Sequence, residues 1–260
     1  MTGRSVKVVA VTQDDPFFTG RFFDVFLSER ASAGVELVEI VLLRNFNESR
    51  GALARRFWSL YGTVDFLRLL GRFAASRLGD RFGRPRSVAA IAARRGVPVR
   101  HLATINDPGY LATLAERGVD VLLSVAAPEI FRAAALAAAP HVLNVHSGRL
   151  PRFRGMMPTF WALEQGEREV VVTVHTMVAK LDAGAIVAEF PMPLRPGESA
   201  YDVSARAKEL GGREVARLLG RLGTPDWPAS RPLDMSGQRY FKFPTGPDAA
   251  RLRAAGTAML

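Results

Sequence analysis

The sequence contains no cysteine, only four lysines and no long hydrophobic run. A chain without cysteine forms no disulfide, thiolate zinc site or iron–sulfur cluster and has no cysteine nucleophile. Its apolar runs fall far short of the ~20 residues that cross a membrane, and the N-terminus shows no secretory hydrophobic region. We therefore expect a protein without a transmembrane segment, located in the cytoplasm.

Positive charge is abundant but confined to one region. The 260 residues carry a formal net charge of +10. Thirteen arginines and only three acids lie between Arg44 and Arg100, and the rest of the chain is neutral. Such a region could contact phosphates through arginine alone. Nucleic acid is not the expected partner, although tRNA is not excluded.

Apolar segments of strand and helix length alternate along the first half. We expect strands at 6–12, 35–43, 97–102, 119–125 and 141–146, with helices at 19–33, 88–95 and 129–138. Strands at 170–177 and 186–192 and an amphipathic helix at 199–219 follow. This alternation predicts the α/β class, with a mostly parallel central sheet and helices on both faces.

The chain is expected to form one catalytic domain over residues 1–222. Residues 223–260 are rich in proline and too few for a second domain, so they are expected to be a C-terminal extension packed on the first. Tyr240 and its neighbours in this extension could also line a pocket or join two copies in a homodimer.

An unusual segment interrupts the domain at about 46–83. Apolar residues recur at helical spacing across 49–78 with arginines among them, which predicts a basic helical insertion. Its arginines could simply be solvated, could form an anion-binding rim near the acceptor entrance, or could belong to a membrane-surface helix.

Three polar residues indicate a chemistry. Asn144 and His146 are two residues apart at the end of a buried strand, so their side chains share a face. Open α/β sheets bind ligands at the carboxyl ends of their strands. Asp182 follows in a Leu-Asp-Ala-Gly turn. An amide, an imidazole and a carboxylate can stabilise an oxyanion and move a proton, which suits acyl transfer without a covalent intermediate.

With these motifs in order, the sequence resembles the folate-dependent formyltransferase family. Methionyl-tRNA formyltransferase, glycinamide ribonucleotide transformylase, sugar N-formyltransferases and formyltetrahydrofolate hydrolase belong to it. The matching residues are Asn144, His146, Leu150-Pro151, Arg154-Gly155 and Leu181-Asp182-Ala183-Gly184, and the resemblance covers about 119–187. It implies a Rossmann-like formyltransferase fold.

The resemblance also implies the donor and the roles of these residues. N10-formyltetrahydrofolate would be the co-substrate, and Asn144 and His146 would hold the developing oxyanion while Asp182 holds the charged imidazole. By family position, the cofactor-binding residues are Ala126, Ala127, Ile130, Val178, Lys180 and Leu181. No metal is expected, because the spacing of histidines and acids matches no metal motif.

One departure from the family pattern concerns the catalytic strand. The family commonly has serine two residues after the histidine, where this chain has Gly148. Ser147 stands beside it. Whether Ser147 replaces the family serine is open from sequence.

The acceptor is less well defined. The segment after the first strand has two acids and no glycine cluster, which disfavours glycinamide ribonucleotide. We expect transfer to the primary amine of a small anionic molecule, such as an amino sugar nucleotide or another biosynthetic intermediate. A methionyl-tRNA formyltransferase-like activity and a formyltetrahydrofolate hydrolase remain the alternatives.

Overall fold

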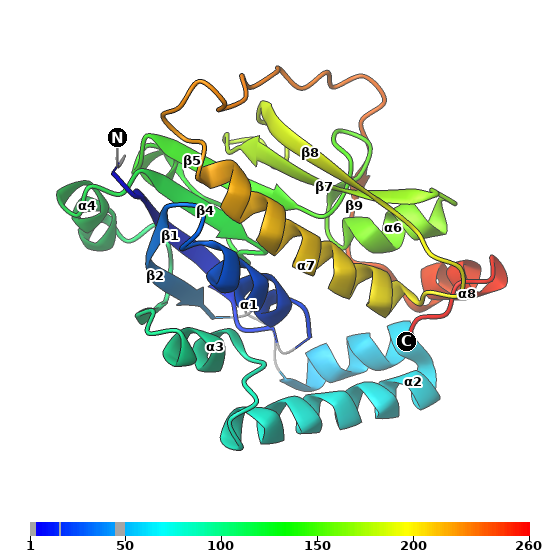
Figure 1. Ribbon diagram of the computed structural model, residues 1–260. Coiled ribbons are helices and arrows are strands. Elements are labelled where there is room, and N and C mark those ends of the chain that lie inside the picture. Colours follow the sequence, from blue (N-terminus) through cyan, green and yellow to red (C-terminus); the bar gives the residue numbers. More distant parts are fainter. Residues whose placement is uncertain (1–3, 16, 45–49) are drawn as a thin grey trace.

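The computed structural model describes residues 4–15, 17–44 and 50–260. A seven-stranded sheet crosses the molecule in the order β3-β2-β1-β4-β5-β7-β8 (Figure 1). Its strands are β1 (Val6–Gln13), β2 (Val35–Leu43), β3 (Val99–Leu102), β4 (Val121–Val125), β5 (His141–His146), β7 (Glu169–Thr176) and β8 (Ile186–Pro193). The first five are parallel, and β7 is antiparallel to both of its neighbours. The predicted fold class is confirmed.

Helices cover both faces of the sheet, because successive strand residues point to opposite sides. Helices α1 (Thr19–Glu29), α3 (Val88–Arg94) and α7 (Ala200–Leu219) pack on one face, and α4 (Pro108–Glu116) and α5 (Ala133–Leu136) pack on the other. In β1, Val8 and Ala10 join the first core, whereas Val9 and Val11 join the second. The sheet is therefore buried on both faces, as its nearly continuous apolar strands predict.

Two elements differ from the expectation. The helix predicted at 129–138 is wrong over its first half, because α5 begins only at Ala133. The Glu129 carboxylate instead accepts hydrogen bonds from the Ile105 N–H (2.8 Å) and the Asn106 Nδ2 (2.9 Å), which hold this stretch as a loop. Helix α4 was not among the predicted elements. Asp107 caps it and Pro108 is its first residue, and this pair is an ordinary signal for the start of a helix.

The basic segment forms a long bent helix. Helix α2 runs over Arg50–Arg81 and bends at Gly62, whose φ of 73° and ψ of 170° are not helical. Residue 49 and the start of the predicted insertion, at 46–48, lie outside the described residues. The helix buries Leu60, Tyr61 and Leu69 in the core beside α7. The predicted helix is thus observed over the described part of 49–78.

Some arginines of α2 contact aromatic rings of the domain. The guanidinium of Arg72 lies 4.2 Å from the centre of the Tyr201 ring, and that of Arg56 lies 4.4 Å from the Phe243 ring. Such cation–π contacts are attractive and add to the burial of the apolar face. These two arginines are therefore part of the packing.

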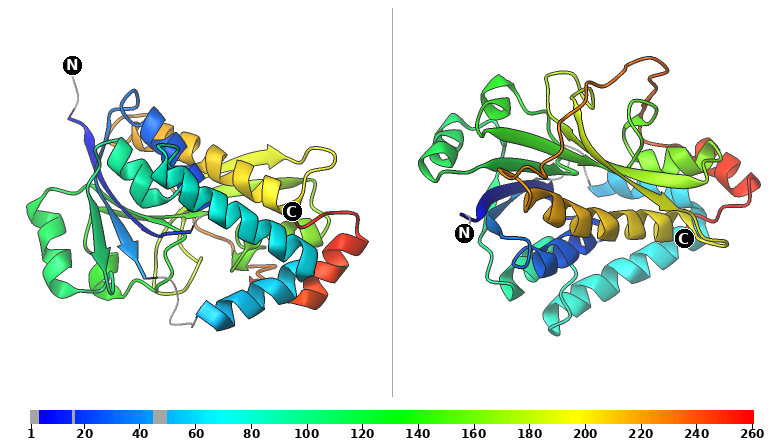
Figure 2. Two further views of the ribbon diagram at one scale, coloured as in Figure 1. Left: turned by 90° about the horizontal axis from the view of Figure 1, so that it is seen from below. Right: turned by 45° about the horizontal axis from the view of Figure 1, so that its top comes forward.

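The C-terminal extension packs across the domain. Its strand β9 (Tyr240–Phe241) pairs in parallel with β6 (Arg154–Gly155), and its helix α8 (Gly246–Ala254) lies beside α2 and α6 (Pro158–Glu164). Figure 2 shows this segment, in brown and red, returning along the domain to the C-terminus. The extension has no core of its own, in keeping with the prediction that it is not a separate domain.

Helix α7 approaches α1 so closely that only glycine fits at one position. A Cβ added at Gly212 would lie 2.4 Å from the carbonyl oxygen of Phe22, whereas one at Gly211 would come no closer than 3.4 Å to the Phe22 ring. We predict that Gly212→Ala lowers the free energy of unfolding by about 1–3 kcal/mol through overpacking. Gly211→Ala should be neutral or stabilising, because alanine is the better helix former. Urea denaturation measures both, and equal midpoints for the two variants would contradict this packing.

Candidate active site

The three residues expected to be catalytic lie in one cleft. Asn144 and His146 are at the end of β5, and Asp182 is in the loop between β7 and β8. All three line a cleft of about 520 Å³ at the carboxyl ends of the parallel strands. The His146 Nδ1 is 3.9 Å from the Asp182 Oδ1. The structure therefore brings together the residues that the sequence selected, while their catalytic roles stay a prediction.

A fourth residue, His175, orients Asn144. The His175 Nδ1 is 2.8 Å from the carbonyl oxygen of Thr176, which can only accept, so Nδ1 carries the proton. The unprotonated Nε2 then accepts from the Asn144 Nδ2 at 3.0 Å. Burial, followed by the nearby His146, lowers the pKa of His175 from 6.5 to about 4. A neutral His175 thus fixes which atom of the Asn144 amide faces it.

His146 is held from both sides. Its Nε2 lies 2.6 Å from the carbonyl oxygen of Phe153, so the proton sits on Nε2 and is donated to that carbonyl. Its Nδ1 faces Asp182, whose other oxygen accepts from the Gly155 N–H at 2.8 Å. A second proton on His146 would therefore sit on Nδ1 and make an ion pair with Asp182. Donation from Nε2 to a substrate oxygen would require exchange of the bond to Phe153.

Buried Arg154 fixes the loop that carries Asp182. Its Nε donates to the carbonyl oxygen of Leu181 at 3.1 Å, and its Nη1 donates to the Gln238 Oε1 at 2.6 Å. At the other end of the loop, a Cβ on Gly184 would lie 1.7 Å from the Thr176 carbonyl oxygen, so only glycine allows this approach. The sequence places Arg154 in the Arg-Gly motif but does not reveal this role.

One wall of the cleft is apolar. Five of the six residues expected to bind the cofactor line it, namely Ala126, Ala127, Ile130, Val178 and Leu181. Lys180 is exposed and is not among the lining residues, and its contact with the cofactor stays a prediction. The solvent-exposed side chains of Ile130, Val178 and Leu181 form an open apolar surface. Such a wall suits a flat aromatic ligand.

Unusual backbone geometry concentrates around the cleft. Over the described part of the chain, the non-glycine residues with positive φ are Ala126 (53°), Met157 (50°) and Asp182 (48°), and each lines the cleft. Positive φ is unfavourable for residues with a side chain. Conformations of this kind persist where the surrounding structure enforces them, and they gather at functional sites.

Gly148 has no room for the serine that the family commonly has there. A Cβ at this position would lie 2.5 Å from the Pro158 Cβ and 3.2 Å from the His146 Nε2. Ser147 lines the cleft, but its hydroxyl oxygen is buried and has no hydrogen-bond partner among the described residues. The structure therefore does not present this hydroxyl to a ligand in the cleft.

A further set of lining residues, most of them polar, was not predicted. Gln13, Asp15, Phe18, Ser204 and Lys208 line the cleft. Half-buried Lys208 makes no hydrogen bond to any residue that the structure describes; burial lowers its pKa, and the Asp15 carboxylate partly opposes that shift. Lysine in the middle of an amphipathic helix resembles a surface residue, so sequence gave only a weak signal: this is one of four lysines in an arginine-rich chain.

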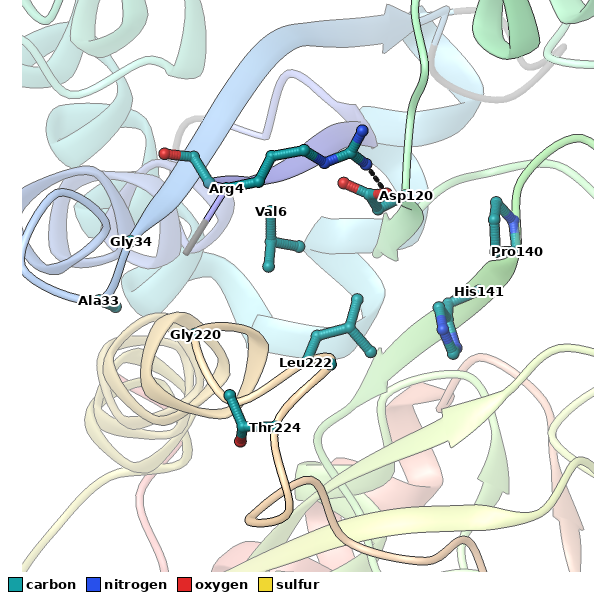
Figure 3. A pocket seen from close by; sticks show the side chains of 12 residues that line it. Arg4, Val6, Ala33, Gly34, Asp120, Pro140, His141, Gly220, Leu222 and Thr224 are labelled. Carbon is teal, nitrogen blue, oxygen red and sulfur yellow. Dashed lines mark hydrogen bonds and ion pairs between the residues drawn. The ribbon is translucent and has the colours of Figure 1, made fainter. Parts of the chain in front are cut away.

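A second cavity of about 570 Å³ opens at the amino ends of the strands (Figure 3). Its charged lining residues are paired: Arg4 forms an ion pair with Asp120, whose second oxygen accepts from the Lys7 N–H at 2.8 Å. None of the catalytic candidates reaches it. The candidate site is therefore the slightly smaller cleft at the carboxyl ends.

Residues 4–15, 17–44 and 50–260 include no helix long and apolar enough to cross a membrane. Within the same ranges, no cluster of three histidines or acids has metal-binding geometry.

Comparison with known proteins gives one consistent result. The sequence profile of the family described as formyl transferase matches residues 87–219. A curated relative, methionyl-tRNA formyltransferase of Rhodopirellula baltica, is 36% identical over 141 residues. That match covers 54% of this chain and 42% of the relative, so the chain spans less than half of the relative's length.

Solved structures share the fold at low identity. Glycinamide ribonucleotide transformylase 1 from Symbiobacterium toebii superposes with a TM-score of 0.57 and 21% identity, over 89% of this chain and 96% of that one. An N-formyltransferase from Helicobacter canadensis, solved in complex with folinic acid and dTDP-3-aminofucose, superposes with a TM-score of 0.55 and 12% identity. The superposition covers 91% of this chain and 71% of that one. The resemblance inferred from the motifs is confirmed by the family match.

The pKa of His175 makes stability depend on pH. Between pH 4 and 6.5 the unfolded chain binds a proton at this residue that the folded chain does not. We predict that the free energy of unfolding falls as the pH is lowered through this window, by up to about 1.4 kcal/mol per pH unit from this group. Denaturation across the range should show a shallower slope for His175→Gln, whereas exposed His101→Gln should keep the wild-type slope. Identical slopes for wild type and His175→Gln would refute the assignment.

Proposed function

Because the chain belongs to the formyl transferase family, we propose that it transfers a formyl group from N10-formyltetrahydrofolate to the primary amine of a small anionic acceptor. The observation that carries this proposal is the composition of the cleft at the carboxyl ends of the strands. Asn144, His146 and Asp182 line it together with apolar side chains and with Lys208. Donor and acceptor would meet at the three polar residues.

The apolar wall fits a folate. Ile130, Val178 and Leu181 present exposed hydrophobic side chains, and the Ala126–Ile130 loop runs along the same wall. A pterin ring could lie against these side chains and hydrogen-bond to the loop backbone. When bound, the donor supplies an activated formyl carbon for attack by the amine.

The polar residues can stabilise that attack. As the new C–N bond forms, negative charge develops on the formyl oxygen, and the amide of Asn144 is oriented by His175 to donate to it. His146 would donate from Nε2 after leaving the Phe153 carbonyl, and Asp182 stabilises its positive charge when Nδ1 is protonated. Fixed donors aimed at a developing oxyanion are effective because they need no reorganisation. The bond between the formyl carbon and N10 of the donor would then break, with cationic His146 giving a proton to the leaving N10 and the proton lost by the amine restoring it.

Lys208 supports an anionic acceptor. It lines the cleft near Asp15, which follows β1, and has no hydrogen-bond partner in the described chain. A phosphate or carboxylate on the acceptor would supply one. The Helicobacter canadensis structure, solved with a nucleotide-linked amino sugar, is consistent with this class. The 36% sequence identity to a methionyl-tRNA formyltransferase favours a second candidate acceptor, the amine of methionyl-tRNA.

The reaction can be tested with a panel of acceptors. We predict that N10-formyltetrahydrofolate is converted to tetrahydrofolate and a formylated amine in the presence of an amino sugar nucleotide or a related anionic amine. His146→Ala should lower kcat by on the order of 10²–10³-fold or more, because it removes an oxyanion donor. The same assay is run with methionyl-tRNA as the acceptor and with no acceptor other than water. Turnover with methionyl-tRNA only, or steady tetrahydrofolate release without any amine, would replace the proposal by the corresponding alternative.

The acceptor end can be tested separately. We predict that Lys208→Gln raises the KM for the anionic acceptor roughly 10-fold or more, because a hydrogen bond to a charged group contributes about 1.5–3 kcal/mol. The KM for the folate should change little. Lys242→Gln removes the same charge from an exposed position and serves as the matched control. An unchanged acceptor KM in Lys208→Gln would remove Lys208 from recognition.

A further inference from the structure

The second half of α2 exposes an apolar face to solvent. Its large exposed side chains are Val64 (63%), Leu67 (61%), Leu70 (47%) and Leu78 (59%), and Phe82 (72%) follows directly after the helix. A helix on the surface of a globular protein normally turns polar residues outward. An exposed apolar surface of this kind is unfavourable in water and indicates that the helix contacts something else.

The exposed residues form one continuous stripe. At 3.6 residues per turn, Leu67, Leu70 and Leu78 fall on the side opposite Leu69 and Ser76, which are buried against the domain. The residues between them on this side are small: glycine at 71 and alanine at 74 and 75. Figure 2 (left) shows α2 lying across the near side of the molecule, with no other element over it. The stripe is a convex, unobstructed ridge.

Positive charge borders the stripe. At 3.6 residues per turn, Arg77 lies at one edge of the stripe and Arg81 falls between Leu70 and Leu78, while Arg84 follows the helix. None of the three forms an ion pair with any described residue. The acids of α2 are directed elsewhere. Asp65 pairs with Arg68 at 3.0 Å, and Asp80 accepts from the N–H of Ser87 at 3.1 Å. The stripe thus has a cationic border without free acids.

We propose that α2 docks this protein on an anionic phospholipid surface. The stripe of Val64, Leu67, Leu70, Leu78 and Phe82 enters the boundary between headgroups and acyl chains, and the bordering arginines contact lipid phosphates. An apolar ridge with basic flanks has the composition of helices that lie in the membrane interface. Each arginine near an anionic surface adds to the attraction. The proposal is independent of the reaction in the cleft.

Charge favours this occupant over a second copy of the chain. In a two-fold dimer each patch meets itself. The arginine border of one ridge would then face the same arginines of its partner, without acids on the ridge to offset them. Anionic lipid is complementary to both the apolar stripe and its border.

The test uses the full chain and vesicle flotation. Vesicles of phosphatidylcholine alone are compared with vesicles that also contain phosphatidylglycerol, each at low and high salt. We expect the bound fraction to rise severalfold with phosphatidylglycerol and to fall with salt. The variant Leu67→Gln/Leu78→Gln/Phe82→Gln should lose binding to both kinds of vesicle. Arg77→Gln/Arg81→Gln should weaken binding to the anionic vesicles by about 5-fold per arginine.

Controls separate docking from general charge and from folding. Arg132→Gln/Arg221→Gln removes the same charge from exposed positions away from α2 and should bind as wild type. All variants should keep the wild-type melting temperature, since only exposed side chains change. No binding to anionic vesicles, or equal loss in the control pair, would overturn the proposal. So would a dimer, seen by sedimentation velocity, that the triple variant dissociates.

Discussion

The antiparallel register between β5 and β7 is the constraint on which the site depends. It sets Asn144 opposite His175 and His146 opposite Thr173. Directly opposed residues in a sheet point to the same face and lie close together. The bond between the Asn144 amide and the His175 ring therefore follows from the register, and a slip by one residue would turn Asn144 and His146 to the other face.

The same register positions the remaining carboxylate. Strand β7 ends at Thr176, and its hydroxyl accepts from the Ala185 N–H at 2.9 Å while Gly184 packs against its carbonyl. The loop from 177 to 185 is thereby closed on itself, so Asp182 returns to the strand end that carries His146. From the other side, Arg154 donates to the carbonyl oxygen of Leu181. The approach of imidazole and carboxylate is a consequence of backbone contacts more than of their mutual attraction.

The C-terminal extension takes part in this arrangement. Two-residue strands such as β6 and β9 are too short to be stable alone. Here Phe241 stacks between Phe153 and Trp161, with ring centres 5.9 and 4.8 Å apart, which buries the strand pair. Gln238 then reaches Arg154, and Phe243 lines the cleft. Residues beyond 222 thus help to hold the loop of Asp182, although the domain boundary expected from sequence set them apart.

The sequence predicted what depends on local pattern. Strand periodicity located the sheet, and the spacing of Asn144 and His146 put both on one face. It could not give the orientation of the Asn144 amide, because that depends on a strand partner 31 residues away. Nor could it tell which apolar stripe of α2 packs inward, because both stripes recur at helical spacing and only the fold decides which one meets a core. The sequence also could not show that 129–132 form a loop and not the start of a helix. That loop is held by the Glu129 carboxylate, which accepts a hydrogen bond from the N–H of Ile105 in a distant turn.

The location of the charge argues for two separate anionic contacts. None of the described residues of α2 lines the cleft, and the arginines that turn inward, Arg56 and Arg72, lie on aromatic rings. Arg77 and Arg81 lie on the outward part of the helix instead. The rings that hold Arg56 and Arg72 belong to the surroundings of the cleft, since Phe243 lines it and the Tyr201 ring lies 5.0 Å from that of Phe18, which also lines it. The expectation that the basic segment lies near the acceptor entrance therefore stays a prediction, and Lys208 in the cleft and the outward arginines would meet different anions.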